Sequence, residues 1–175
     1  KSIDKNWFIL SKGHAGLSQY VALSMLGFFS EKQLKSEFLK NGGKLGVHPE
    51  QGSLPGIDVS SGSLGHGLSI ANGLAISKKT DKLKGNIYVL LSDGECNEGM
   101  TWEAAMFASH HKLNNIIAIV DYNKIQALGK NKDILILEPF KDKFKAFGWS
   151  VKLINGHNIN DLKKSFLISK KLKKP

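Results

Sequence analysis

Two short apolar runs in the middle of the chain give the clearest structural pattern. Segments 87–91 and 116–120 are rich in β-branched residues and bounded by turn residues, which is typical of strands buried in a parallel sheet. Segment 98–111 between them is long enough for a crossover helix. Together they predict a βαβ unit, and such units are almost always right-handed. Alternating residues at 149–154 predict a third strand.

The periodicity of the flanking segments predicts helices around this sheet. Helices are expected at about 15–27, 31–39, 69–79 and 141–147, with a last helix that Asn160 caps and that runs to about residue 172. Residues 1–10 are expected to be extended, and 44–67 and 126–136 to be loops. The expected fold class is therefore α/β, a mostly parallel sheet with helices on both faces, in a single domain over residues 1–175.

Polar residues follow both central strands. Asp93 and Gly94 come after the first strand, and Asn123 comes after the second. Because open α/β sheets bind ligands at the carboxyl ends of parallel strands, these residues are expected to meet there. A carboxylate and an amide oxygen suit Mg²⁺ or Ca²⁺, and glycine allows a phosphate to approach the backbone. The alternative is an ordinary helix-capping Asp and a turn Asn.

Composition excludes some classes of protein and leaves others open. The hydrophobic fraction of 41% and the charged fraction of 23% are ordinary for a globular domain, and no apolar run approaches the roughly 20 residues of a membrane span. The single cysteine, Cys96, excludes an internal disulfide and suits the cytoplasm. The net charge is +10 and every basic side chain is lysine, so no guanidinium of this chain can clamp a sugar phosphate. The lysines are scattered apart from a cluster at 163–174, which favours a solvated surface over a nucleic-acid site.

Several motifs together resemble one family. Segment 93–99 reads Asp-Gly-Glu-Cys-Asn-Glu-Gly, and Asn123 lies 30 positions after Asp93. This pattern resembles the thiamine diphosphate motif of transketolases. Four further segments match that family in order, namely 11–15, 46–50, 61–67 and 111–115. The closest form is the small N-terminal subunit of split transketolases. Ser92 departs from the motif, which usually has glycine there.

The resemblance implies a role for individual residues. Mg²⁺ or Ca²⁺ would be held by Asp93, Asn123 and the backbone carbonyl of Ile125. Thiamine diphosphate would be contacted by His14, Gly62, Ser63, Leu64, Gly94 and Asn123. The residues implied in catalysis are His48 beside the reactive thiazolium, His14, and Glu98 in a proton relay to the partner. Each has a plainer alternative, namely a capping or core His14, a surface His48, a helix-start Glu98 and glycines in ordinary turns.

The resemblance also implies a partner. In the family, the glutamate that activates the cofactor lies on a pyrimidine-binding domain, which segment 1–175 does not match. The chain is therefore expected to be truncated at both ends relative to the family and inactive alone. It is expected to pair with a C-terminal transketolase subunit, to form a dimer of such pairs, and to act on phosphosugars in the cytoplasm, with neither nucleic acid nor membrane as a partner.

Three alternatives remain at this point. One is another thiamine diphosphate enzyme such as deoxyxylulose-phosphate synthase, although Val47-His48-Pro49-Glu50 keeps three of the four residues that usually mark transketolases. The second is a non-catalytic interaction subunit. The third, a basic nucleic-acid-binding domain, rests on charge alone, and strongly salt-dependent DNA binding would support it.

Overall fold

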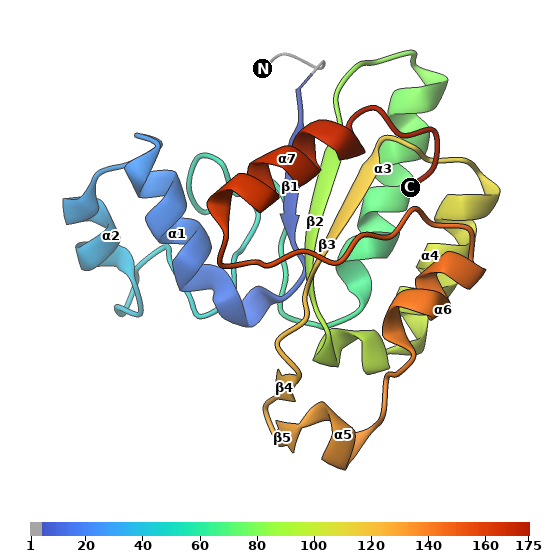
Figure 1. The fold of residues 1–175 in the computed structure, drawn as a ribbon. Coiled ribbons are helices and arrows are strands. Elements are labelled where there is room, and N and C mark those ends of the chain that lie inside the picture. The colour runs from blue at the N-terminus through green and yellow to red at the C-terminus, as the bar shows by residue number, and fades with distance from the viewer. Residues whose placement is uncertain (1–4) are drawn as a thin grey trace.

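A three-stranded parallel sheet organises the molecule (Figure 1). The computed structural model describes residues 5–175, so the first four residues of the predicted extended segment lie outside it. The strands are β1 (Trp7–Leu10), β2 (Ile87–Ser92) and β3 (Ile116–Asp121), in the order β1-β2-β3. Ser92 pairs with Asp121, so β2 and β3 end side by side. The predicted βαβ unit is confirmed, with α4 (Gly99–His110) between β2 and β3.

Helices cover both faces of this sheet, which confirms the predicted α/β class. On β2, Ile87, Val89 and Leu91 are fully buried in one core with α3 (His66–Thr80) and α4. Alanines on these helices let them approach the sheet closely: Ala71, Ala75, Ala104, Ala105 and Ala108 are all in this core. On the other face, the Tyr88 ring meets Phe166 of α7 (Ile159–Ser169) at 5.9 Å between ring centroids.

A smaller core lies beside the sheet, under the N-terminal helices. The turn η1 (Gly13–Ala15) leads into α1 (Gly16–Met25), and α2 (Glu31–Glu37) follows. The Ser30 hydroxyl accepts a hydrogen bond from the Gln33 amide at 3.1 Å and caps α2. Segment 44–65 has no helix or regular strand, as predicted, and supplies Leu45, Leu54 and Ile57 to this core. The long loop is therefore packed into the smaller core.

The predicted third strand at 149–154 is wrong, because that segment is irregular. Trp149 is buried there, and its indole nitrogen donates to the Ala105 carbonyl at 2.9 Å. One large ring packed against α4 and α6 (Phe140–Ala146) explains the apolar signal without a strand. The third strand is instead β1, in the segment predicted only to be extended.

Smaller differences concern element ends. Asn158, and not Asn160, caps α7, because its side-chain oxygen accepts from the amides of Asn160 at 3.0 Å and Asp161 at 3.3 Å. The predicted loop at 126–136 contains three short elements: β4 (Ile125–Gln126), β5 (Gly129–Lys130) and α5 (Asn131–Ile134). Within residues 5–175, no helix is long and apolar enough to cross a membrane.

Candidate functional site

Asp93 is the centre of the strand-end site. It follows β2, is fully buried, and begins the turn η2 (Gly94–Asn97). One carboxylate oxygen accepts from the Gly94 amide at 2.8 Å, and the other accepts from the Lys124 amide at 2.6 Å. The structure therefore brings the Asp93 side chain directly against the loop that follows β3.

Asn123 lies in that loop, two residues beyond β3. Its side-chain oxygen accepts from the Ile125 amide at 2.9 Å, and its side-chain nitrogen donates to Asp121 at 3.5 Å. Lys124, between Asn123 and Ile125, has a φ of 65°, so the backbone turns sharply there. Because the Lys124 amide of this loop donates to Asp93, its chain neighbours Asn123 and Ile125 lie on either side of that contact.

The ligands available at this edge suit a metal ion that is coordinated partly by the protein and partly by a phosphate. Among the described residues, no group of three or more His, Cys, Asp or Glu side chains could hold a metal ion. Asp93, an amide oxygen and a backbone carbonyl would leave about three positions of an octahedron open. Mg²⁺ usually fills such positions with phosphate oxygens and water. The site is therefore suited to a metal-bridged diphosphate rather than to a metal held by protein alone.

Gly94 and Gln126 form one wall of this site. A Cβ atom added at Gly94 would lie 2.9 Å from Cβ of Gln126, so a side chain there would not fit without displacing the loop. The side-chain nitrogen of Gln126 is buried and has no hydrogen-bond partner within the described part of the chain. A buried donor of this kind is costly unless a ligand or water satisfies it, which favours a polar occupant.

The two predicted site histidines form a second group, next to Gly62. A Cβ atom at Gly13 would lie 2.5 Å from the Gly62 amide nitrogen, and one at Gly62 would lie 3.1 Å from the His48 ring. His14 is exposed at the adjacent turn η1. The structure therefore brings segments 11–14, 48 and 61–62 into contact although they are far apart in sequence.

The surroundings of His14 keep it uncharged at neutral pH. Partial burial, followed by the positive charge of Lys12, holds the pKa of His14 below its ordinary value of 6.5. His48 lowers this pKa further, whereas Glu95 and Asp121 raise it. A neutral imidazole can donate one N–H and accept at its other nitrogen.

Ser63, Leu64 and Glu98 surround the start of α3. The Ser63 hydroxyl lies 3.3 Å from the His66 ring nitrogen, and Leu64 is half-buried. Gly65 has a φ of 82°, and a Cβ atom there would lie 2.9 Å from Cβ of Glu98. Glu98 is exposed at the start of α4, and its side chain makes no capping hydrogen bond to that helix. Glu98 thus lies at the helix start, where its charge can interact with the helix dipole without a capping hydrogen bond.

Sequence reasoning missed an ion pair that joins two strand ends. The Lys12 ammonium lies 2.6 Å from an Asp121 carboxylate oxygen, and the Lys12 side chain is only 11% exposed. The pair joins the end of β1 to the end of β3, on either side of Asp93. No local pattern connects residues 109 positions apart.

It also missed the structural role of Glu95. Glu95 is fully buried. Its amide donates to the Ser92 hydroxyl at 3.2 Å, and its carboxylate accepts from the Ser92 amide at 3.2 Å. This reciprocal pair is a capping box, which a Ser followed three residues later by Glu could have indicated. Ser92, where the resembling motif has glycine, therefore has a definite partner.

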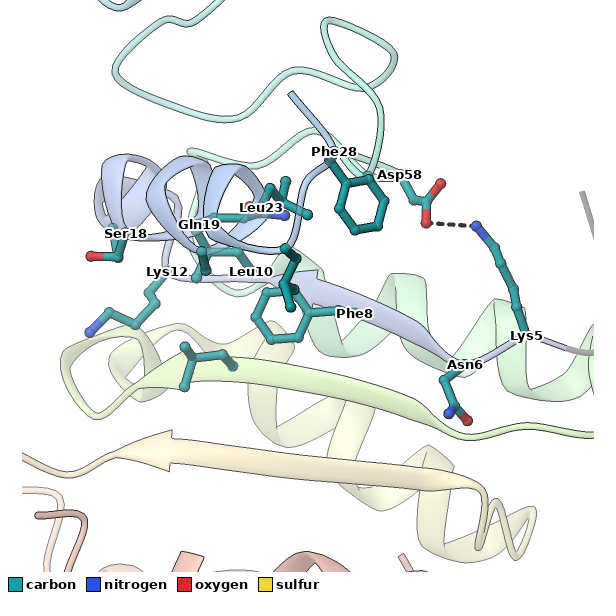
Figure 2. A pocket seen from close by; sticks show the side chains of 15 residues that line it. Lys5, Asn6, Phe8, Leu10, Lys12, Ser18, Gln19, Leu23, Phe28 and Asp58 are labelled. Carbon is teal, nitrogen blue, oxygen red and sulfur yellow. Dashed lines mark hydrogen bonds and ion pairs between the residues drawn. The ribbon is translucent and has the colours of Figure 1, made fainter. Parts of the chain in front are cut away.

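A larger hollow lies away from these residues. An apolar groove of about 800 Å³ lies between β1 and α1, lined by Phe8, Leu10, Leu23 and Phe28. Figure 2 shows these side chains around it. Lys12 stands at one end, and the ion pair of Lys5 with Asp58, at 2.7 Å, stands at the other. None of the predicted site residues lines this groove, so size alone does not identify the functional site.

Comparisons with known proteins agree with this geometry. Residues 1–175 match the family model described as the thiamine diphosphate binding domain of transketolase. The 6-deoxy-6-sulfo-D-fructose transketolase subunit of Clostridium sp. (strain MSTE9) is 42% identical over 159 residues, which are 91% of this chain and 58% of that protein. An apulose-4-phosphate transketolase subunit of Phocaeicola vulgatus is 39% identical over 166 residues, which are 95% of this chain and 58% of that protein.

A solved structure of a transketolase is also similar to this chain. Transketolase from Campylobacter jejuni superposes with a TM-score of 0.93 at 33% sequence identity, covering 99% of this chain and 28% of that chain. The chain thus spans 58% of the length of the two curated relatives, and little more than a quarter of the solved one.

Proposed function

The chain belongs to the transketolase family and matches the thiamine diphosphate-binding domain of that family, and we propose that it forms the diphosphate- and metal-binding half of an enzyme that transfers two-carbon ketol units. The unit would pass from a ketose phosphate to an aldose phosphate. The names of the two curated relatives, both transketolase subunits, support this reaction.

The observation that carries the proposal is the contact between Asp93 and the loop of Asn123. The 2.6 Å hydrogen bond from the Lys124 amide fixes the carboxylate against that loop. Asp93, Asn123 and the Ile125 carbonyl would hold Mg²⁺ or Ca²⁺. The residues that would hold thiamine diphosphate are His14, Gly62, Ser63, Leu64, Gly94 and Asn123. When bound, the cofactor supplies a nucleophilic thiazolium carbon, which no protein side chain provides.

The chain's own residues would bind, orient and move protons. His14, neutral at pH 7, would donate an N–H to a diphosphate oxygen. His48, held against Gly62, would hydrogen-bond the substrate near the reacting carbon. Asp93 is buried and already held by two amides, so its position is set before any metal binds.

A partner would complete the site. The side chain of Glu98 is exposed and makes no hydrogen bond within residues 5–175, so it is free to face another chain. We propose that a C-terminal subunit supplies the pyrimidine-binding domain and the activating glutamate, and that two such pairs associate. Residues 1–175 contain no arginine, so any arginine clamp on a phosphosugar would come from outside this segment, for example from that partner. A cytoplasmic location fits a segment whose single cysteine, Cys96, is buried.

The test is ketol transfer with and without that partner. Mixtures of ketose and aldose phosphates would be incubated with thiamine diphosphate, Mg²⁺ and the chain, alone or with a candidate C-terminal subunit from the same source. Mass spectrometry would then detect sugars changed by two carbons. The proposal expects products only when both subunits are present. Turnover by the chain alone would refute partner dependence, and no turnover with any partner would refute ketol transfer.

A further inference from the structure

The Glu95 carboxylate lies at the meeting point of three loops. One of its oxygens accepts from the Ser11 hydroxyl and from the Gly65 amide, the latter at 2.8 Å. The other accepts from the Ser92 amide at 3.2 Å. The side chain is fully buried, and no ion pair with a lysine is found for it within residues 5–175. The carboxylate is therefore held by hydrogen-bond donors from three separate places in the chain.

Each donor lies next to proposed site residues in the chain. Ser11 precedes the turn with His14, Gly65 follows the segment of Gly62, Ser63 and Leu64, and Ser92 directly precedes Asp93. The fully buried Glu95 side chain therefore forms hydrogen bonds next to Asp93, next to the turn of His14 and next to segment 62–64.

The packing between these loops leaves little freedom. The Ser11 hydroxyl also accepts from the Gly67 amide at 3.1 Å, and a Cβ atom at Gly67 would collide with Ser11. In the same way, a Cβ atom added at Gly13 would collide with the Gly62 backbone. A shift of Ser11 would consequently move both the His14 turn and the Gly62 segment.

We propose that Glu95 is a positioning residue, whose carboxylate sets the separation and orientation of the three cofactor-site loops without contacting the ligand. The identity of that ligand rests on the proposed function. A carboxylate suits this position because both of its oxygens accept hydrogen bonds and neither donates. Glutamine has the same shape, but its NH₂ group would face either the Ser92 amide or the Ser11 and Gly65 donors.

The first test needs no cofactor. Backbone amide hydrogen exchange would be measured by NMR in the full chain for wild type, Glu95→Gln and the control Glu103→Gln, which changes an exposed glutamate on α4. In Glu95→Gln, the side-chain NH₂ replaces only one of the two acceptors, so we expect the amide of either Gly65 or Ser92 to exchange at least about tenfold faster, the effect of one lost buried hydrogen bond. The Val89 amide and all amides of the control should be unchanged.

The second test uses the assembled enzyme. In Glu95→Gln, we expect the apparent KM for thiamine diphosphate with Mg²⁺ to rise about 10–100-fold, as for other residues that orient ligands. The kcat at saturating cofactor should change much less, because no reacting group is removed. A fall in kcat with unchanged KM would contradict a positioning role.

The outcomes separate this inference from the proposed function. Unchanged exchange at Gly65 and Ser92 in Glu95→Gln would overturn the inference, as would equally faster exchange at Val89, which indicates general destabilisation. If Glu95→Gln does not fold, Ser11→Ala removes one donor, and unchanged exchange at Gly65 and Gly67 in that variant would overturn it. Failure of the wild-type complex of both subunits to bind thiamine diphosphate would refute the proposed function, while the exchange result would still decide the role of Glu95.

Discussion

Gly13 has no room for a side chain, and this makes it a sensitive probe of the site. A Cβ atom at position 13 would lie 2.5 Å from the Gly62 amide nitrogen, 2.8 Å from its Cα and 2.9 Å from the Ser61 carbonyl carbon. Ordinary contacts begin at 3.4 Å, so alanine would force these backbones apart by roughly 1 Å. All three atoms belong to the main chain, which cannot rotate out of the way as a side chain can.

We expect Gly13→Ala to lose both stability and ligand affinity. Overpacking of this kind typically costs about 1–3 kcal/mol of unfolding free energy. A displacement of about 1 Å in a positioned site can reduce activity about 100-fold. Urea unfolding would give the first quantity, and calorimetric titration of thiamine diphosphate with Mg²⁺ into the complex of both subunits would give the second.

Gly73→Ala is the matched control. Gly73 is an exposed glycine inside α3, and no atom lies within 4 Å of the position that its Cβ would take. Alanine there should stabilise the helix by about 0.5–1 kcal/mol and leave binding unchanged. Our account of the glycine contact would be refuted if Gly13→Ala unfolded at the wild-type urea concentration and bound the cofactor with wild-type affinity.

Three further predictions concern charge and packing. The pKa of His14, followed by NMR titration of its ring protons, should lie below 6.5 and should rise in Lys12→Met, because that variant removes a neighbouring positive charge. Since the folded-state pKa of His14 is lowered, its contribution to stability is present above pH 6.5 and should be lost as pH falls from there through the lower folded-state value. His14→Gln should therefore lose less stability between pH 7 and 5 in urea unfolding. Trp149→Phe should cost about 1–3 kcal/mol in the same assay, because the buried Ala105 carbonyl loses its 2.9 Å donor, and a wild-type midpoint would contradict that reason.

The sequence predicts the parts of this fold that depend on local patterns. The apolar runs that became β2 and β3 are continuous and β-branched, so burial in a parallel sheet leaves a clear signal. The meeting of Asp93 with the Asn123 loop follows from that sheet, because parallel strands end at one edge. The residue types at this edge then predict the metal and phosphate chemistry.

The parts that sequence reasoning missed depend on contacts between distant segments. β1 has only four residues, and its role as a strand is decided by pairing with β2 across about 80 positions. The apolar signal at Trp149 comes from a ring that packs against a helix, which a two-residue period cannot distinguish from a strand. The Lys12 pair with Asp121 has no local trace at all. Glu95 did have one, the capping box with Ser92, but its other two donors are visible only in the folded chain.

The most direct test of the central claim is cofactor binding at Asp93. Thiamine diphosphate with Mg²⁺ would be titrated calorimetrically into the chain alone, into the chain with a candidate C-terminal subunit, and into that complex carrying Asp93→Ala or the control Asp142→Ala. Asp142 is exposed on α6 and pairs there with Lys145 at 3.1 Å, not with a proposed site residue. We predict binding only in the complex, its loss in Asp93→Ala and its retention in Asp142→Ala. Equal binding by Asp93→Ala, or no binding by the folded wild-type complex, would contradict the account.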